Sequence, residues 1–563
     1  MPGEPVAAAG VRAFFLLAAA AGIVSVGCGR SRVSVESDLD AADMVGTGAS
    51  SGAPSAHGGT GGANPGFGGG SVGATGGVAS SGGSGGSTFG GGGGVGPSSG
   101  GTGGVSGVSG VSGVSFGGAT AAGTGNGGSG ASGASGASGS GGALPKFQLL
   151  GVPLTFAPTP RGFSLNAVLS AGDPGALALY LRLTGDTTWR QVTTFPTFPA
   201  GDTAQWALQG LMAATRYEYL LTAKDGATET GLYVGSVVTT RPPGTPFTAA
   251  LLTDTHIQPR EVPPGDVSTS GSMEDTLALV APDITAVTPD FMINLGDILD
   301  FHAFGFNDPP PDPSWARLGY LNYRRLLSTT LGNAPHFGVI GNWDGENGCN
   351  TVEEIERSRS QRLIYEPNPS PETYPEGGSV NQDYYAFTWG DALFIVLNVM
   401  TYTPGCHLLD TYPGLPDDWT LGDAQLTWLR TTLQNATSKW RFTFIHHTVG
   451  GKAGNDVDSA YGRGGGQAAY VGEQAIIHQM LLDYGVQIFF YAHDHVFTDM
   501  TVDGVHYTLP GSAGAPWKFT SEETGYTSYW PDSGFARLDV SPDTVDVSFI
   551  AQGGAVLDKI HLP

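Results

Sequence analysis

Five short apolar segments of this chain each end in side chains that can bind metal ions. The clearest is Phe291–Asp300 (FMINLGDILD), in which the apolar run stops at Gly296 and Asp297 follows at once. The other four end in Asp254-Thr255-His256, Gly341-Asn342-Trp343-Asp344, His446-His447 and His493-Asp494-His495. Asp, Asn and His offer the oxygen and nitrogen atoms that hard and borderline metal ions prefer. One such segment alone is better explained as a turn after a strand, but five in one domain predict a metal centre.

Each of these segments has the pattern of a buried strand. The runs are almost continuously apolar and too short for helices, which is typical of strands covered on both faces in a parallel sheet. They are Phe247–Thr253, Phe291–Leu295, Phe337–Ile340, Trp440–Ile445 and Val486–Ala492. Because ligands bind at the carboxyl ends of strands in open α/β sheets, we expect the five ends to meet at one site.

Helical patterns alternate with these strands. They cover Glu274–Val287, Trp315–Leu331, Asp423–Ala436 and Gly472–Tyr484. Pro282 is expected to kink or split the first of them, because proline lacks the N–H that a helix interior requires. The second is expected to bury a stripe on or near which lie Trp315, Leu318, Leu321, Leu326 and Leu327. The alternation predicts βαβ units and a largely parallel sheet, with loops at 303–313, 366–378 and 450–466 around the site.

The ordered motifs resemble those of a known superfamily. The series Asp-X-His, Gly-Asp-X-X-Asp, Gly-Asn-X-Asp, His and X-His-X-His is similar to that of the calcineurin-like metallophosphoesterases, and within them to the purple-acid-phosphatase-like branch. Residues 384–398, 421–447 and 502–515 resemble its central hairpin, its helix-to-strand approach and its closing strand. The resemblance implies a four-layer αββα sandwich over residues 246–563, with two sheets packed face to face.

The resemblance also implies the cofactors and the ligands. Two ions of Fe, Mn or Zn would hold a bridging hydroxide and polarise the phosphoryl oxygen of a small phosphate ester. The first ion would be held by Asp254, His256 and His495, the second by Asn342, His446 and His493, and Asp297 would bridge them. The expected catalytic residues are therefore Asp297, Asn342 and His446, with Asp300, Asp344 and His447 supporting the ligands. His446 is preferred to His447 as ligand by the family pattern, and strand alternation would send the two to opposite sides.

Three positions depart from the family pattern. Trp343 stands where the family usually has the histidine that stabilises the phosphoryl group or protonates the leaving alkoxide. That loss should slow catalysis without destroying the metal site, unless His302, His447 or another loop histidine replaces it or the leaving group needs no acid. Ala492 replaces a glycine, a methyl-sized change. Asp300 occupies the position of the tyrosine ligand of purple phosphatases, so their charge-transfer colour is not expected.

The N-terminal part has the composition of an export signal followed by a tether. Arg12 precedes an apolar run, 13–26, which is short for a membrane span and resembles a secretory signal core. Residues 1–28 are predicted to be a signal peptide that ends in a bacterial lipoprotein-like site at Cys28, with cleavage without lipidation as the alternative. Residues 29–143 are predicted to be a disordered linker, because the Gly- and Ser-rich tract from 46 onward cannot bury enough apolar surface to order itself.

The cysteine count and the charge limit the compartment and the partners. Apart from Cys28, the chain has Cys349 and Cys406, which are expected to pair in an oxidising compartment, with two free buried thiols as the alternative. The net charge of −25 makes nucleic acid an unexpected partner. We expect an exported protein, either secreted or held at the cell envelope, whose contact with a membrane is limited to the N-terminal lipid.

Residues 144–245 have the alternating pattern of an all-β domain. Strands are expected at 163–169, 176–183, 189–192, 215–222 and 233–239, which suits a β-sandwich. Residues 208–219 resemble the penultimate strand of fibronectin type III-like domains, with Tyr217 or Tyr219 as the tyrosine that folds back at a corner. Arg241-Pro242-Pro243-Gly244 is expected to mark the boundary with the following domain.

Three functional hypotheses remain. The first is an exported metallophosphoesterase that acts on small phosphomonoesters or phosphodiesters. The second is a catalytically weakened binding module on the same scaffold, for which Trp343 is the argument. The third, an envelope adhesion or spacer protein, explains the tether and the sandwich but not the metal ligands. The complete ligand set favours the enzyme, because an inactive copy need not keep it.

Overall fold

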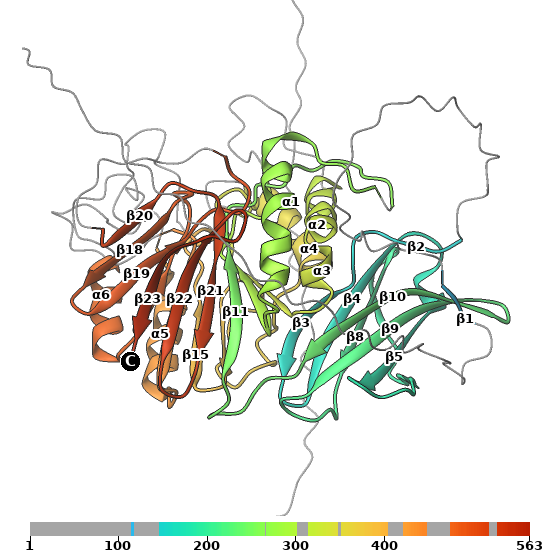
Figure 1. Cartoon of the computed structure of the whole chain (residues 1–563), viewed down its shortest axis with the longest axis horizontal. Helices are drawn as coiled ribbons and strands as arrows, with labels where there is room; N and C mark the ends of the chain where they lie inside the picture. The colour runs from blue at the N-terminus through green and yellow to red at the C-terminus, as the bar shows by residue number, and fades with distance from the viewer. Residues whose placement is uncertain are drawn as a thin grey trace, which may run out of the picture. The chain divides into compact units, whose positions relative to one another are not determined.

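The fold is taken from a computed structural model of the chain (Figure 1). It describes residues 114–116, 146–264, 266–300, 314–346, 351–402, 420–447, 473–516 and 526–563, which belong to one compact unit, Thr102–Pro563. The predicted signal, Cys28, Cys349, Cys406, His302 and almost all of the linker lie outside the described residues. Among the helices of the described ranges, none combines the length and the apolar character needed to cross a bilayer.

The first folded part is a β-sandwich of two antiparallel sheets. One sheet has the order β10-β9-β5-β6, and the short β1 pairs in parallel with β10. The other has the order β3-β4-β8-β7, with β2 pairing with β4. The strands are β1 Val114–Phe116, β2 Gln148–Leu149, β3 Leu154–Thr159, β4 Gly162–Ala171, β5 Leu177–Leu183, β6 Arg190–Gln191, β7 Thr197–Ala200, β8 Thr203–Leu208, β9 Arg216–Asp225 and β10 Thr228–Val238, and a single 3-10 turn, η1, covers Pro174–Ala176.

Alternating side chains of both sheets form the core of this sandwich. Phe163 of β4, Trp206 of β8 and Tyr219 of β9 are among its fully buried residues. The two tyrosines proposed for the corner have different partners. Tyr217 Oη accepts a hydrogen bond of 3.0 Å from the backbone N–H of Met212, five residues upstream. Tyr219 instead donates to a carbonyl outside the sandwich, as described below.

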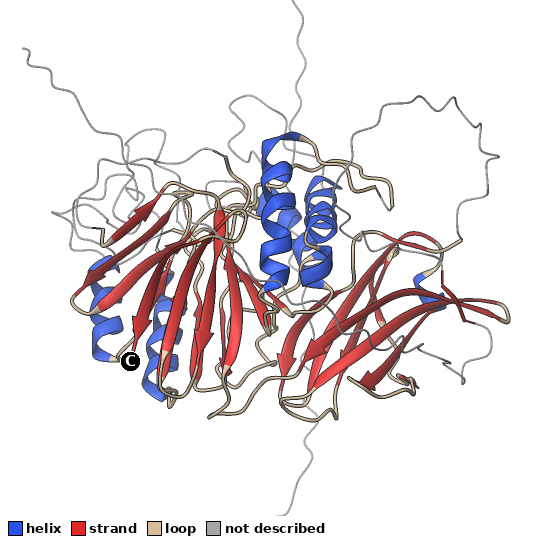
Figure 2. Ribbon diagram, in the orientation of Figure 1, coloured by secondary structure: helices blue, strands red, loops and turns tan. Residues whose placement is uncertain are grey.

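The second folded part contains two sheets that pack face to face, as expected (Figure 2). The first carries the parallel strands β11 Phe247–Leu252, β12 Phe291–Asn294 and β13 His336–Gly338, flanked by β21 Gly534–Val540, β22 Val545–Ala551 and β23 Val556–Leu562. The second carries β14 Tyr385–Trp389, β15 Ala392–Val396, β16 Trp440–Phe444, β17 Ile488–Phe490, β18 Phe497–Val502, β19 Val505–Pro510 and β20 Ser528–Trp530. The predicted strands are therefore present, and β15, β16 and β17 are parallel neighbours.

Aromatic rings fill the space between the two sheets. Phe291 of β12 lies 5.2 Å from Phe394 of β15, measured between ring centroids. Phe337 of β13 stacks on Phe387 of β14 at 4.0 Å. These contacts explain why the strands read as continuous apolar runs: their other faces are covered by helices, so each strand is buried on both sides.

The helices form the outer layers. They are α1 Gly271–Ala286, α2 Ser314–Leu326, α3 Ser328–Leu331, α4 Val352–Tyr365, α5 Gly422–Asn435 and α6 Glu473–Asp483. Residues of the first four share a core with β11 and β12. Residues of α5 and α6 share a core with β15, β16 and β17. The order of layers is therefore helix, sheet, sheet, helix.

Pro282 was expected to kink or split the first helix, and it does not split it. Helix α1 is continuous through this residue. A proline inside a helix costs about 3 kcal/mol. Burial of Leu277, Val280 and Ile284 in the core contributes roughly 1.5–3 kcal/mol for each side chain, which outweighs that cost.

The region after it was also predicted incorrectly in two respects. One helix was expected over 315–331, but the chain forms α2 and α3, which are separated at Leu327. Trp315 was placed on or near the buried stripe, yet it is 47% exposed, and the buried face carries Tyr320 and Tyr323.

Helix α4 was not expected at all. Its sequence signal is the capping box, in which the side chains of Thr351 and Glu354 bind each other's backbone N–H groups.

The two folded parts share one hydrogen-bonded sheet. Strand β13 pairs in parallel with β3, with His336 opposite Phe156, so the order runs β23-β22-β21-β11-β12-β13-β3-β4-β8-β7. Tyr219 of the sandwich donates a hydrogen bond of 3.0 Å to the carbonyl oxygen of Gly332. Arg241 forms a bidentate ion pair with Asp290 at 2.7 Å. The sequence predicted a boundary here, but not this continuity.

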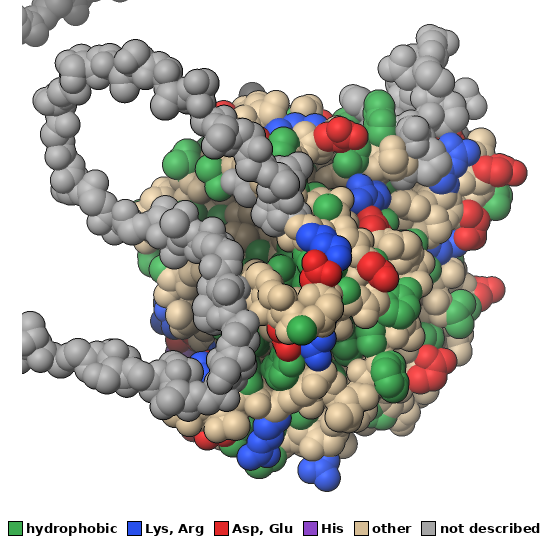
Figure 3. Space-filling view, turned by 90° about the vertical axis from the view of Figure 1, so that its right-hand side faces the viewer, with side chains coloured by type: hydrophobic (Ala, Val, Ile, Leu, Met, Phe, Trp, Pro, Cys, Tyr) green, Lys and Arg blue, Asp and Glu red, His purple; other side chains and the backbone are tan. Residues whose placement is uncertain are grey.

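Charges of both signs lie together on the surface. On the face drawn in Figure 3, basic and acidic side chains are interspersed among apolar ones. Lys146 pairs with Asp225 and Arg182 with Glu218 on the β-sandwich. These exposed or half-exposed pairs contribute little to stability, typically about 0–1 kcal/mol each.

Candidate metal centre

The predicted ligands lie at the carboxyl ends of strands from both sheets. Asp254 and His256 follow β11, Asp297 follows β12 and Asn342 follows β13. His446 follows β16, and His493 and His495 follow β17. Within each sheet these strands are parallel neighbours, so their ends lie at the same edge. The face-to-face packing of the two sheets brings the two sets of ends together.

One group consists of Asp254, His256, Asp297 and His495. Their potential ligand atoms all lie within 4.8 Å of one another, and the four residues are buried. His495 Nε2 is 3.4 Å from Asp254 Oδ1 and 3.2 Å from His256 Nε2. His256 Nε2 is 3.6 Å from Asp297 Oδ2. This group has the composition predicted for the first ion together with the bridging carboxylate.

The second group also lies close to Asp297. His446 Nε2 is 3.1 Å from Asp297 Oδ2, and its Nδ1 is 2.8 Å from the carbonyl oxygen of Leu295. Asn342 Oδ1 is 3.0 Å from His493 Nδ1. Asp297 Oδ2 therefore faces a histidine of each group, which is the position that a bridging carboxylate requires.

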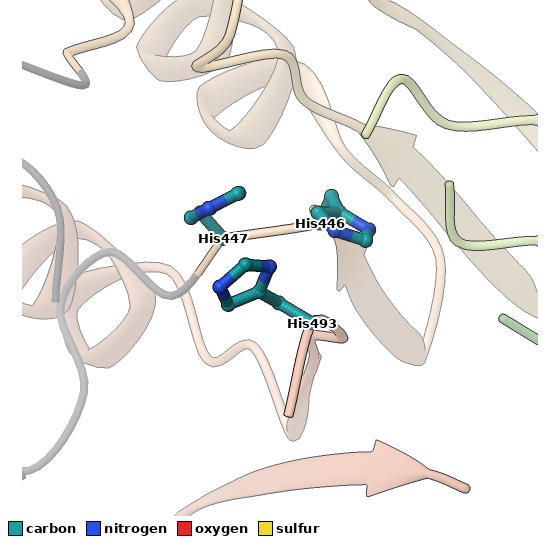
Figure 4. A group of neighbouring side chains, drawn as sticks. All are labelled: His446, His447 and His493. Carbon is teal, nitrogen blue, oxygen red and sulfur yellow. The ribbon is translucent and has the colours of Figure 1, made fainter. Parts of the chain in front are cut away.

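His447 also lies in this second group, contrary to the expectation that it points away. Its ring centroid is 4.1 Å from that of His493, and its ring nitrogens lie close to those of His446 and His493 (Figure 4). The expectation assumed that strand alternation continues to these residues. Strand β16 ends at Phe444, so the alternation no longer applies at positions 446 and 447.

Buried polar atoms at this site lack hydrogen-bond partners. Among the described residues none donates to or accepts from Asp254 Oδ1, Asp254 Oδ2, Asp297 Oδ2 or His446 Nε2. Asp297 Oδ2 and His446 Nε2 lie 3.1 Å apart, but this contact does not have the geometry of a hydrogen bond. Leaving such groups buried is costly, and bound cations would satisfy them. The oxygen and imidazole donors fit Fe, Mn or Zn, so the residues present fit a metal centre.

The backbone of the site is strained. Positive φ angles, which non-glycine residues rarely adopt, occur at Asp254 (52°), His256 (46°), Asp297 (51°), His493 (80°) and His495 (60°). Each such conformation costs roughly 1–3 kcal/mol and persists only when its surroundings hold it. Here backbone hydrogen bonds hold it, including Asp254 N–H to the Gly296 carbonyl at 3.0 Å and His256 N–H to the Asp297 carbonyl at 2.9 Å.

Glycines allow the ligands to approach one another. A Cβ atom on Gly296 would lie 2.7 Å from His446 Nδ1, and one on Gly341 would lie 2.1 Å from Asp297 Oδ1. Gly514 has a similar role, because a Cβ there would lie 2.0 Å from the Thr255 carbonyl oxygen.

Burial and neighbouring carboxylates set the charge states of the histidines. Burial lowers the pKa of His256 to about 4, so this imidazole is neutral at pH 7 and has a lone pair for a metal ion. Burial also lowers the pKa of His446, but the carboxylates of Asp297 and Asp254 and the Leu295 carbonyl together outweigh that effect and raise the pKa to about 9. A cation bound next to Asp297 would take the place of that proton.

Asp344 fastens the loops that carry the ligands. Its two carboxylate oxygens accept hydrogen bonds from the backbone N–H groups of Asp297 (3.0 Å), Leu299 (3.0 Å) and Gly341 (2.8 Å). Burial and the nearby Asp297 raise the pKa of Asp344 to about 7. Asp300 is half-buried and accepts a hydrogen bond of 3.1 Å from Gln258.

Glu346 is a supporting residue that was missed in the sequence. It is fully buried at the end of the same loop and pairs with Arg359 and Arg362 of α4. The sequence indicates Glu346 only indirectly. The capping box at Thr351 predicts helix α4, and α4 carries the two arginines that pair with Glu346.

One family model matches part of the chain. Residues 247–497 match the family model of the calcineurin-like phosphoesterases. The matched range begins at β11 and includes all of the predicted ligands. The metallophosphoesterase domain and its buried Asp and His cluster together support metal-dependent hydrolysis of phosphoesters. No curated protein matches the sequence.

Two solved structures have a similar fold. A structure of PhoD superposes with a TM-score of 0.56 at 14% identity, over 72% of this chain and 88% of that one. The purple acid phosphatase PPD1 from seeds of yellow lupin (Lupinus luteus) superposes with a TM-score of 0.55 at 12% identity, over 73% of each chain. At these identities the likeness concerns the fold alone.

Proposed function

We propose that this protein hydrolyses small phosphate esters at a centre of two metal ions. Asp254, His256 and His495 would hold one ion, Asn342, His446 and His493 would hold the other, and Asp297 would contribute to both sites. Two adjacent ions would supply a water molecule that is acidic enough to lose a proton near neutral pH, and would polarise the phosphoryl oxygen. The observation that carries the proposal is the set of buried ligand atoms of Asp254, Asp297 and His446 that lack hydrogen-bond partners among the described residues.

The residues of the chain hold and orient the reacting groups. The neutral His256 adds no charge to its ion, which leaves that ion strongly Lewis acidic. The Leu295 carbonyl lies at Nδ1 of His446 and leaves Nε2 directed at Asp297, so the tautomer suits a metal ligand. Asp344 keeps the strained loop of Asp297 in place. Because the ligands are buried and preorganised, little rearrangement is needed when substrate binds.

A comparison of Asp297→Asn with the native chain tests this function. The full-length protein is loaded with Mn, Fe or Zn and assayed on an aryl phosphate and an aryl phosphodiester. We expect hydrolysis by the native protein and a loss of at least about 100-fold in Asp297→Asn, because the substitution weakens the hold on both ions. Metal binding by the native protein without hydrolysis of either ester would favour the weakened binding module, for which Trp343 is the argument.

The other parts of the chain have supporting roles in this proposal. The β-sandwich is a fibronectin type III-like spacer, supported by its strand order and by the Tyr217 corner. The N-terminal segment exports the protein and Cys28 carries the lipid, while Cys349 and Cys406 form a disulfide. The net charge of −25 and the interspersed surface charges support a small ester rather than nucleic acid as the substrate.

A further inference from the structure

Trp343 lies beside the metal ligands at the position of the missing family histidine. Its ring centroid is 5.4 Å from that of His256, at an interplanar angle of 77°. The side chain is partly buried, whereas the ligands around it are fully or almost fully buried. The indole therefore lies beside a predicted metal ligand and remains partly exposed.

The loop that presents Trp343 is fixed at several points. The backbone N–H of Trp343 donates a hydrogen bond of 2.8 Å to Asp297 Oδ1. Asp344 accepts three backbone hydrogen bonds, one of them from Gly341 at the start of the loop. Glu346 anchors the end of the loop to two arginines of α4. The backbone of this loop is therefore fixed, so the indole is presented to the site from a defined position.

We propose that Trp343 determines substrate specificity, and that its indole is the surface against which the aromatic leaving group of an aryl phosphate ester packs. This inference rests on the proposed function and names the substrate class. An indole has a large apolar face and one N–H donor, and it cannot supply a proton to a leaving group at neutral pH. Trp343 can therefore bind an aromatic ring, whereas a histidine at this position could donate a proton to the leaving group.

The chemistry of the leaving group agrees with this assignment. As water oxygen bonds to phosphorus, the bond from phosphorus to the ester oxygen breaks, and that oxygen leaves with the electron pair. A phenolate tolerates this charge, because a phenol has a pKa of about 10. An alkoxide is about as basic as hydroxide, since water has a pKa of about 15.7, so an alkyl ester depends on a proton donor. A site without a donor at position 343 therefore favours aryl esters.

Binding of non-hydrolysable analogues tests the packing without relying on catalysis. Phenylphosphonate and methylphosphonate are titrated by calorimetry into the metal-loaded, full-length native protein, Trp343→Phe and Trp343→Ala. We expect the native protein to bind phenylphosphonate roughly 3- to 10-fold more tightly, and Trp343→Phe to keep most of this preference. Trp343→Ala should lose it while still binding methylphosphonate. An unchanged ratio in Trp343→Ala would overturn the proposal.

The dependence of rate on the leaving group supplies a second test. With a series of aryl and alkyl phosphates, kcat/KM of the native protein should fall steeply as the leaving group becomes more basic. Trp343→His should lower the ratio of aryl to alkyl rates by roughly 100-fold, because general acid catalysis typically contributes 10²–10⁴-fold. A ratio that stays the same in Trp343→His would contradict the inference. Absence of any ester hydrolysis by the native protein would instead contradict the proposed function, so the two failures are distinguishable.

Discussion

Asp344 shows how a single side chain supports the centre without being one of its ligands. Its carboxylate offers two acceptor oxygens to three backbone N–H groups that belong to two different strand ends. One of these groups is the N–H of Asp297, whose φ of 51° is unfavourable for an aspartate. The hydrogen bonds to Asp344 thus help to hold the strained conformation that directs Asp297 Oδ2 toward both sets of histidines.

Asp344→Asn is expected to destabilise the protein and to weaken metal binding. An amide has one acceptor oxygen, and its NH₂ group would face a backbone donor, which leaves a buried donor unsatisfied. The expected loss in free energy of unfolding is about 1–3 kcal/mol, measured by denaturant titration. Asp300→Asn is the matched control, because Asp300 is half-buried and its replacement should change stability by less. Equal effects of the two substitutions would show that Asp344 has no special role.

The sequence predicted which residues would meet at the site, but not their conformations. An apolar run that ends in Asp or His indicates a strand end, and the strand pattern places such ends together. The positive φ angles at Asp254, His256 and Asp297 are held by hydrogen bonds between loops that are far apart in the sequence, and no local sequence pattern indicates them. The position of His447 was mispredicted for a related reason, since the strand ends two residues before the pair of histidines.

Helix α4 links the outer layer to the metal centre. Arg359 and Arg362 lie on its buried face and pair with Glu346, which closes the loop of Asn342 and Trp343. Arg362 also donates to the carbonyl oxygens of Asn381 and Gln382. The helix thus joins the loop of the first sheet to the segment that precedes the second sheet.

Glu346→Gln should be strongly destabilising. It leaves two buried arginines without their carboxylate, and breaking a buried ion pair in this way typically costs about 3–5 kcal/mol. Glu356→Gln is the matched control, since Glu356 pairs with the same Arg359 but is 63% exposed, and it should cost at most about 1 kcal/mol. Thermal and denaturant unfolding of the two variants measure the difference. Similar stabilities would contradict this account of α4.

Sequence patterns predicted most helices, because the apolar residues of these helices repeat at helical spacing. The patterns failed where buried charges or tertiary packing determine the helix. Helix α4 buries charged residues, Arg359 and Arg362, instead of an apolar stripe, so its periodicity is weak. Helix α1 passes through Pro282 because its tertiary packing outweighs the local preference.

At the scale of the whole molecule, the β-sandwich and the metallophosphoesterase domain are joined as one sheet. The pairing of β13 with β3 covers what would otherwise be an exposed edge strand. The Arg241–Asp290 pair and the Tyr219–Gly332 hydrogen bond add contacts between segments that lie between β3 and β13 in the sequence. Long-range strand pairing of this kind has no local signal, which is why the sequence indicated two domains and not their continuity.

Removal of the sandwich should therefore destabilise the catalytic part. A fragment of residues 246–563 is expected to unfold at a lower temperature than one of residues 144–563, and to aggregate through the exposed edge of β13. Differential scanning calorimetry and light scattering measure both properties. If the shorter fragment is monomeric and as stable as the longer one, the shared sheet is not important for stability.

The central claim is that seven residues at strand ends, one of them Asp297, bind two metal ions. The most direct measurement is the metal content of the full-length protein after dialysis, determined by elemental analysis and compared with that of Asp297→Asn. The account predicts about two ions per native chain and at most one in the variant, because the bridging carboxylate is lost. A native protein without bound metal, or a variant with the same content as the native protein, would contradict it.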